Sequence, residues 1–257
     1  NLGLFILLTG VCMACLALMS DFGTAAIFFV TFLVIAYLRS GDYTTLALIC
    51  GGAVFGGLVL VTVKPYILRR FAAWGHAWEQ ASDGGFQQTR TMSAAASGGL
   101  IGVGPGEGWL HRVSAADTDL VFGMLCEEWG LLIAVLSVVC IAALAVFAIR
   151  SCRAGRSSFY TIAACAATSL LVFQTTLNVL GSVDILPLTG VTFPFVSHGG
   201  SSMLASWGLL SFLKAADTRS NASFAIQLQK IHGEDWLGNV LSARGKRAGK
   251  EVRREKD

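Results

Sequence analysis

Acidic side chains at the edges of long apolar runs are the residues of this chain best suited to chemistry. Asp117 and Asp119 stand just before an apolar stretch, and Glu127 and Glu128 follow within it. A carboxylate near hydrocarbon is costly to hold, so such groups are candidates for function. The chemistry they offer is general acid–base catalysis, in which a carboxylate takes or gives a proton at the reacting centre.

The spacing of these residues allows two interpretations. On a helix, Asp119 would share one face with Phe122 or Gly123 and then with Cys126 or Glu127. Alternatively, the carboxylates decorate a helix N-terminus, where the helix dipole favours negative charge. A paired-carboxylate hydrolase would also need a separation between carboxylates that a sequence does not give.

Asp21 begins the segment Asp-Phe-Gly-Thr between two apolar runs. Its side chain could cap the helix that follows by accepting N–H groups of the first turn, and this role can coexist with a functional one. His76, His111 and His198 could each bind a ligand, although isolated histidines are more often structural. The chain has no H-E-x-x-H, G-x-S-x-G or Walker A pattern.

Lys64, Arg69 and Arg70 follow the third apolar run. Long basic side chains at such a position can snorkel to lipid headgroups. The alternative is a binding site for an anionic lipid substrate, such as one that carries a diphosphate.

Composition determines which elements must position these groups. Of 257 residues, 54% are hydrophobic and only 14% are charged, whereas a soluble domain is about 25% charged. This excludes an ordinary soluble enzyme, a disordered chain and a coiled coil. It predicts an all-α polytopic membrane protein, because a helix of about 20 apolar residues can span a bilayer.

Six uncharged runs are the predicted membrane spans. Their ranges are 2–19, 22–38, 43–63, 129–149, 157–183 and 201–213. Residues 185–200 are predicted as a loop or broken helix, because Pro187, Gly190 and Pro194 interrupt them.

The basic residues predict the orientation. Fourteen of the nineteen Lys and Arg residues lie in loops on one side of the spans or in the tail, and the positive-inside rule places that side in the cytoplasm. A large loop at 64–119 and a second one at 184–202 are then extracytoplasmic, and the basic tail 216–257 is cytoplasmic. Within the large loop, 86–100 is predicted as an amphipathic or re-entrant helix at the outer leaflet. The alternating glycines of 102–108 forbid a regular helix.

Four stretches resemble motifs of the SEDS family of shape, elongation, division and sporulation proteins, the FtsW/RodA/SpoVE group. They are Asp21–Thr24, Ser97–Gly104, Thr118–Phe122 with Glu127–Gly130, and Leu186–Ser202, which ends in Pro-Phe-Val-Ser-His-Gly-Gly-Ser-Ser. Ser20 replaces the usual Pro of the first motif, and His198 replaces the usual Tyr of the last. The resemblance implies that residues 1–215 are the C-terminal six helices of a protein with about ten, which agrees with a first residue other than Met.

The same resemblance implies a peptidoglycan glycosyltransferase that polymerises lipid II at the outer face of the bacterial cytoplasmic membrane. A class B penicillin-binding protein would be its transpeptidase partner, and nucleic acid is not expected as a partner. Asp119 matches the family's essential acidic residue. It would take the proton from the 4-hydroxyl of the acceptor GlcNAc, which attacks C1 of the donor MurNAc with inversion and releases undecaprenyl diphosphate.

The resemblance also implies roles for further residues. Positive charge for the leaving diphosphate would come from Lys64, Arg69 and Arg70 or from a divalent metal ion, and metal binding by Asp119 is the rival assignment. The remaining substrate contacts would come from other motif residues. These are Asp21, Ser197, His198, Ser201 and Ser202.

The chain departs from the family before Thr118. It reads Val-Ser-Ala-Ala-Asp where a Leu-Pro-Glu-x-His pattern is usual, so the candidates for a second carboxylate are Asp117, Glu127 and Glu128. Two other functions stay open: a flippase or transporter of lipid II, and a non-catalytic scaffold for the penicillin-binding protein. Transport is disfavoured because the predicted spans hold almost no ionisable residue at mid-depth.

Overall fold

The computed structural model describes residues 2–19, 21–63, 71, 73–154 and 158–217, and all regular structure within them is helical. The elements are α1 (Leu2–Leu18), α2 (Phe22–Ser40), α3 (Tyr43–Val63), α5 (Phe86–Gly98), the short 3-10 helix η1 (Leu110–Arg112), α6 (Val121–Ala154), α7 (Ser158–Ser182) and a last helix at 200–217. The predicted all-α class is confirmed.

Local signals define the ends of α2 and the start of α3. The Asp21 side chain accepts a hydrogen bond from Thr24 N at 3.0 Å and so caps α2. Gly41 ends α2 in the left-handed conformation, with φ of 64°. Asp42 then accepts hydrogen bonds from the backbone N–H groups of Thr44 at 3.1 Å and Thr45 at 3.3 Å, and these bonds lower the pKa of its carboxyl group.

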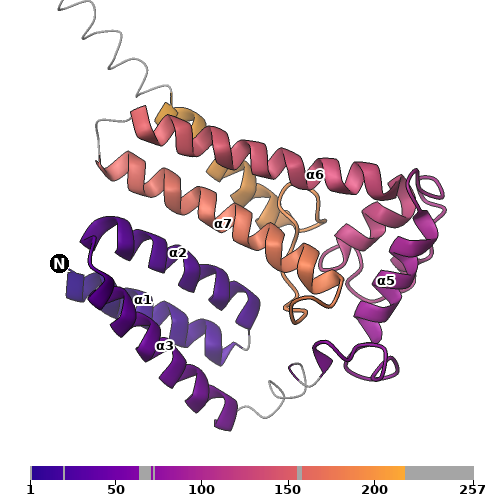
Figure 1. Cartoon of the computed structure of the whole chain (residues 1–257), viewed down its shortest axis with the longest axis horizontal. Coiled ribbons are helices and arrows are strands. Elements are labelled where there is room, and N and C mark those ends of the chain that lie inside the picture. Colours follow the sequence, from indigo (N-terminus) through magenta and orange to yellow (C-terminus); the bar gives the residue numbers. More distant parts are fainter. Residues whose placement is uncertain (1, 20, 64–70, 72, 155–157, 218–257) are drawn as a thin grey trace, which may run out of the picture.

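The long helices lie side by side (Figure 1). α7 is central: α6 packs along one side of it and α2 along another, while α1 and α3 lie against α2. Ile27 of α2 meets Leu177 of α7 in a small buried cluster that also contains Val191. The last helix joins α6 and α7 where Leu213 packs with Ala148 and Leu171.

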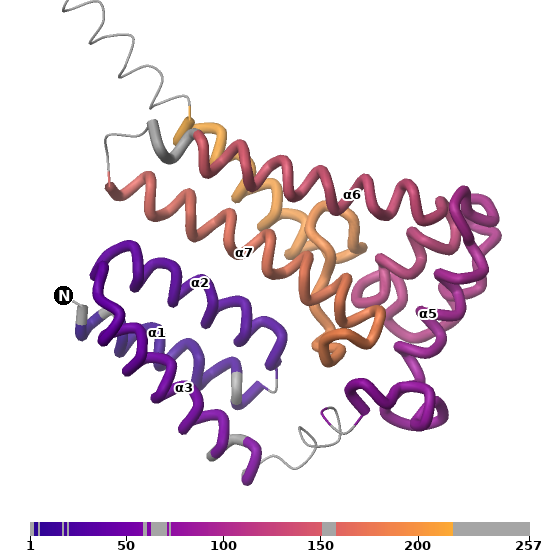
Figure 2. Tube along the Cα trace, viewed as in Figure 1, coloured from indigo at the N-terminus to yellow at the C-terminus, as the bar shows by residue number. Residues whose placement is uncertain are grey.

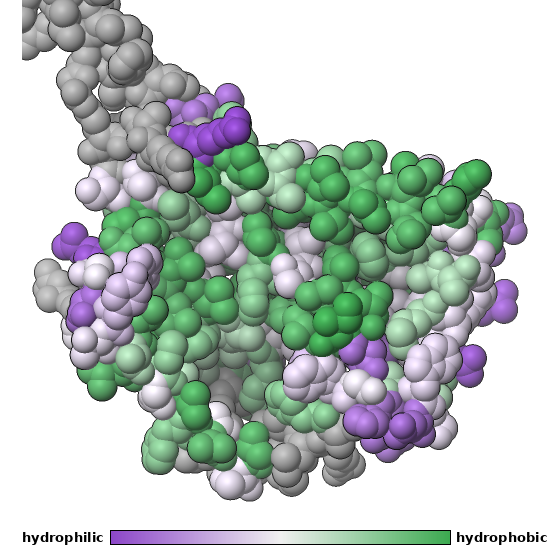
Figure 3. Space-filling model, viewed as in Figure 1, coloured by the Kyte–Doolittle hydropathy of each residue, from purple (hydrophilic) through white to green (hydrophobic). Residues whose placement is uncertain are grey.

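The surface of this bundle suits a bilayer. Among the residues that the structure describes, three helical segments are long and apolar enough to cross a membrane, namely Phe22–Ser40, Val121–Arg150 and Ser158–Ser182. Ile6–Leu16 and Tyr43–Leu58 are shorter apolar helices. Hydrophobic residues cover much of the visible face over α6, and hydrophilic residues gather toward the two ends of this helix (Figure 3). The chain is therefore a polytopic membrane helix bundle, with a helix at each of the six predicted spans.

The fourth span differs from its prediction. α6 begins at Val121 rather than at Trp129, and Asp119 lies in the turn before it, so the predicted shared helix face of Asp119 and Glu127 is wrong. Gly130, with φ of 84° and ψ of 165°, breaks the helix. The uncharged run that predicts this span begins after Glu127 and Glu128, whereas both glutamates lie in the first turns of α6 and accept hydrogen bonds from backbone N–H groups outside it.

The irregular segments were predicted correctly. Residues 185–199 form no helix before the last helix begins at 200, and Figure 2 shows this trace looping back between α6 and α7. α5 is a helix, as predicted for 86–100, and the glycine-rich residues after it are not helical. The position of α5 at the outer leaflet stays a prediction.

Asp184, at the end of α7, holds the segment before α5. Its Oδ1 accepts hydrogen bonds from Gly75 N and from Gln88 Nε2, both at 3.1 Å, and its Oδ2 accepts one from Ala77 N at 3.2 Å. Asp184 has a φ of 60°, a conformation that Asp and Asn adopt more readily than most residues. Nearby, Trp74 Nε1 donates to the Ile185 carbonyl at 2.9 Å. One carboxylate thus joins three separate segments.

We expect Asp184→Asn to loosen this junction, because an amide keeps the left-handed conformation but brings N–H groups toward backbone N–H donors. The expected loss is about 1–3 kcal/mol of local stability, seen as faster hydrogen–deuterium exchange in peptides covering 73–88. Asp83→Asn, at an exposed carboxylate of the same segment, is the control. Equal exchange in the two variants would contradict the role given to Asp184.

Candidate functional site

Asp119 lies in a tight turn that leads into α6. Its N–H donates to the Ala115 carbonyl at 2.9 Å, and Ala115 itself has a φ of 59°. The side chain is half-buried. Behind the turn, Leu120 and Ala116 pack with Ala94 of α5 and Leu110 of η1 in a buried cluster. The turn is therefore fixed by its own hydrogen bonds and by a small apolar core.

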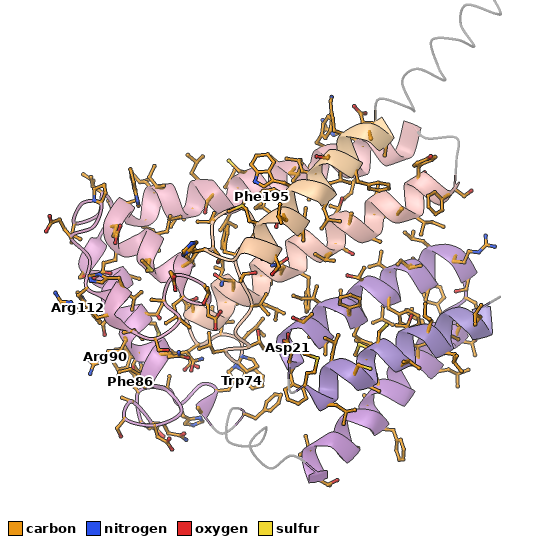
Figure 4. The ribbon with its side chains drawn as sticks, turned by 180° about the vertical axis from the view of Figure 1, so that it is seen from behind. Asp21, Trp74, Phe86, Arg90, Arg112 and Phe195 are labelled. Carbon is orange, nitrogen blue, oxygen red and sulfur yellow. The ribbon has the colours of Figure 1, made fainter. Side chains whose placement is uncertain are left out.

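The two most specific motifs of the sequence are bonded to each other. Ser197 Oγ donates to the Thr118 carbonyl at 2.6 Å and accepts from Phe193 N at 2.7 Å. His198 N donates to the Asp117 carbonyl at 2.9 Å. Residues 117–119 and the 190–198 segment, which are far apart in sequence, consequently form one unit. Phe195 of this segment lies beside the last helix, with its ring against Trp207 (Figure 4).

The carboxylate of Asp119 lies against the backbone of Gly190. A Cβ atom at Gly190 would stand 3.2 Å from Asp119 Oδ2. Gly190 has a φ of 73°, a conformation that glycine adopts without a steric penalty. A side chain here would be strained and would crowd the carboxylate. This explains why a glycine suits the position.

His198 and Asp117 form an exposed pair beside this unit. His198 Nδ1 lies 3.3 Å from Asp117 Oδ2, and the two side chains are 88% and 59% exposed. Ion pairs this exposed contribute at most about 1 kcal/mol. Both groups are instead accessible to a ligand that approaches the Asp119 turn.

Glu127 and Glu128 hold the loop that connects α5 to η1. Glu127 is 1% exposed; its Oε1 accepts from Trp109 N at 2.8 Å and its Oε2 from Leu110 N at 3.1 Å. Glu128 Oε2 accepts from Gly106 N at 3.0 Å. Both carboxylates therefore bind backbone N–H groups. Of the three candidates for a second carboxylate, Asp117 contacts the 190–198 segment, through His198.

The remaining predicted residues are spread more widely. Asp21 stands at the N-terminal end of α2, at the same end of the bundle as Trp74 (Figure 4). Ser202 Oγ is 2.7 Å from Thr192 Oγ1, and Ser201 is exposed at the start of the last helix. Lys64, Arg69, Arg70 and nearly all of the basic tail lie outside the described residues.

The described residues do not fit a metal centre. Among them, no group of three or more His, Cys, Asp and Glu side chains could hold an ion. In the part of the chain that the structure describes, a metal ion bound by Asp119 would thus have at most one other His, Cys, Asp or Glu ligand.

Sequence reasoning missed two residues that shape this region, Asp184 and Asn178. Asn178 Nδ2 donates to the carbonyls of Asp119 at 2.9 Å and Val191 at 2.7 Å. The available signal is a strongly polar amide inside an uncharged span, a property that Asn178 shares with Gln174, and such a group is costly to bury unless it is bonded. Because Asn178 carries no charge, it is absent from the candidates drawn from ionisable residues.

These features define a polytopic α-helical membrane protein with an acidic turn docked on an irregular segment at one end of the bundle. The model of the FtsW/RodA/SpoVE family, described as cell cycle protein, matches residues 2–222. The chain belongs to this family.

Relatives agree with this assignment. The chain is 31% identical over 195 residues to peptidoglycan glycosyltransferase RodA of Mycobacterium leprae, covering 75% of this chain and 42% of that protein. It is 32% identical over 194 residues to probable peptidoglycan glycosyltransferase FtsW of Escherichia coli, covering 72% and 46% respectively. The chain thus spans about half the length of the curated relatives it matches.

A solved structure shares the fold. It comes from work on the structural coordination of polymerization and crosslinking by a peptidoglycan synthase complex. The TM-score is 0.64 at 22% sequence identity, with 83% of this chain and 60% of that chain covered.

The contacts of Glu127 lead to a stability prediction. Glu127→Gln keeps the shape of the side chain but replaces one acceptor by an NH2 group that faces the N–H of Trp109 or Leu110. We expect it to cost about 1–3 kcal/mol, measured as a lower thermal unfolding midpoint and faster proteolysis between 100 and 113. Glu128→Gln, which disturbs a more exposed contact, should cost less than half as much. The reverse order would show that Glu127 does not hold the loop.

Proposed function

We propose that this chain is the part of a peptidoglycan glycosyltransferase that carries its catalytic base. The substrate is lipid II, and the reaction extends glycan strands at the outer face of the bacterial cytoplasmic membrane. Two relatives bear the names peptidoglycan glycosyltransferase and probable peptidoglycan glycosyltransferase. The docking of the Asp119 turn on the 190–198 segment is the observation that carries the proposal, because it joins the two motifs most specific to the family.

Asp119 is the proposed general base. Its carboxylate accepts the proton of the 4-hydroxyl of the acceptor GlcNAc as that oxygen forms a bond to C1 of the donor MurNAc. The bond from C1 to the diphosphate oxygen breaks with inversion, and undecaprenyl diphosphate leaves with the electron pair. The proton then passes from Asp119 to water, which restores the carboxylate. A positioned base of this kind contributes about 10²–10⁴-fold to the rate.

The surroundings of Asp119 favour this role. A half-buried carboxylate on a rigid turn can stay in place while the substrate moves, which general base catalysis requires. The exposed side chains of His198 and Asp117 lie at the same turn and offer contacts to the sugar or diphosphate groups. We assign further substrate contacts to Asp21, Ser201 and Ser202. Ser197 is not among them, because it is buried and its hydroxyl group is bonded to Thr118 and Phe193. Lys64, Arg69 and Arg70 are proposed to stabilise the leaving diphosphate.

The proposal includes an orientation and a partner. The start of α2 and the 189–191 segment share one end of the bundle with the Asp119 turn, and we place this end outside the cytoplasm. The C-terminal tail is then cytoplasmic. A class B penicillin-binding protein is the proposed partner, in keeping with the structural neighbour from a peptidoglycan synthase complex.

Asp119→Asn tests the mechanism in the full-length protein. The amide keeps the size of the side chain but cannot accept the proton, so polymerisation of fluorescent lipid II should fall by at least about 10²-fold. Product length on gels and thermal unfolding in the same detergent are the measurements. Glu79→Gln, at an exposed carboxylate of the segment before α5, should keep normal activity and serves as the matched control.

The same variant separates the two other functions. A scaffold would still allow Asp119→Asn to complement a deletion strain fully. If the protein is a flippase, the unsubstituted protein would move lipid II across vesicle membranes without forming polymer. Full complementation by a folded Asp119→Asn variant, or transport without polymer by the unsubstituted protein, would refute the assignment of Asp119 as the base.

A further inference from the structure

Asn178 is buried in α7 close to its C-terminal end and is 2% exposed. It uses both hydrogens of one amide nitrogen: Nδ2 donates to the Asp119 carbonyl at 2.9 Å and to the Val191 carbonyl at 2.7 Å. A single side chain thus joins the turn that carries the proposed base to the segment that faces it. Gly190, which lies against the Asp119 carboxylate, is the residue next to one of these two anchor points.

We propose that Asn178 is a positioning residue for Asp119, an inference that rests on the proposed function. Its amide sets the distance between the Asp119 peptide and the Val191 peptide, and this fixes where the carboxylate stands relative to the 190–198 segment. On the other side of the same turn, Ser197 holds the preceding Thr118 peptide. Because Ser197 binds the Thr118 carbonyl and Asn178 binds the Asp119 carbonyl, the backbone on each side of Asp119 has little freedom to shift.

The chemical type of residue 178 supports this role over simple packing. Asn is the smallest neutral side chain with two donors on one atom, whereas Ser has one and Asp has none when ionised. Asn178 also has an unfavourable feature: its Oδ1 is buried with no hydrogen-bond partner among the described residues. An unsatisfied buried acceptor destabilises the folded state. An apolar residue would avoid this destabilisation but would lose the bridge.

A neighbouring amide provides a comparison. Gln174, one helical turn earlier on the same face of α7, donates from Nε2 to the Thr192 carbonyl at 3.0 Å and to Thr192 Oγ1 at 2.9 Å. Both amides therefore hold the 191–192 backbone, but only Asn178 has a described bond to Asp119. The difference between variants at 174 and 178 isolates the effect of that bond.

The test measures steady-state polymerisation of a fluorescent lipid II by the full-length protein. For Asn178→Leu we expect kcat to fall by about 10- to 100-fold, because a misplacement near 1 Å can cost that much, while KM changes by less than about threefold. Thr175→Val removes a buried hydroxyl whose described bond stays within α7 and should keep normal kcat and KM. Asn178→Ser, which retains one donor, is used if Asn178→Leu does not fold, and an intermediate kcat is then expected.

Hydrogen–deuterium exchange gives a second readout that needs no activity. Asn178→Leu should speed exchange in peptides that cover 115–121 and 188–193, whereas Gln174→Met should speed it only in the second region. The inference is overturned by unchanged kcat in a folded Asn178 variant, by an equal loss of kcat in Gln174→Met, or by exchange that rises in only one region. Activity retained in Asp119→Asn would instead refute the proposed function and leave the exchange prediction intact.

Discussion

Hydrogen bonding of irregular backbone at one end of the helix bundle is the constraint on which this structure depends. Residues 113–120 and 184–199 are not regular helix, so their buried N–H and C=O groups need partners from elsewhere, at about 1–3 kcal/mol for each one left unpaired. Each segment supplies some of the hydrogen-bond partners that the backbone of the other segment needs. Ser197 of the second segment donates to the Thr118 carbonyl, and Asn178 of α7 donates to the Asp119 carbonyl.

Acidic residues meet the same need in the outlying loops. Glu127 accepts the N–H groups at the start of η1, and Asp184 accepts those of the segment before α5. In each case a carboxylate replaces the backbone partner that a helix or sheet would have supplied. This distinguishes carboxylates with an evident architectural role from Asp119, which belongs to the docked pair of family motifs. Charge near the bilayer is therefore a starting point for finding a site rather than sufficient proof of one.

Several features followed from residues close together in the chain. The apolar composition required membrane helices, because only a helix or a closed barrel satisfies its own backbone within lipid. Gly and Pro between 185 and 200 correctly predicted an interruption, and Asp21 was correctly predicted as a cap for α2. The predicted start of the fourth span was wrong because the span was limited to the uncharged run that follows Glu127 and Glu128. Their compensating N–H donors come from residues 106–110, beyond the reach of any local pattern.

The sequence by itself determined the class of protein, the order of the membrane helices and the motifs that place the chain in its family. Each of these depends on local composition or on a short pattern. Only the tertiary structure decided that Asp119 lies before α6, that it lies against Gly190, and that Asn178 holds it. The bond between Asn178 and Asp119 joins residues 59 apart. A donor at that distance along the chain leaves no periodic signal, and only the packing of α7 against the turn brings the two groups together.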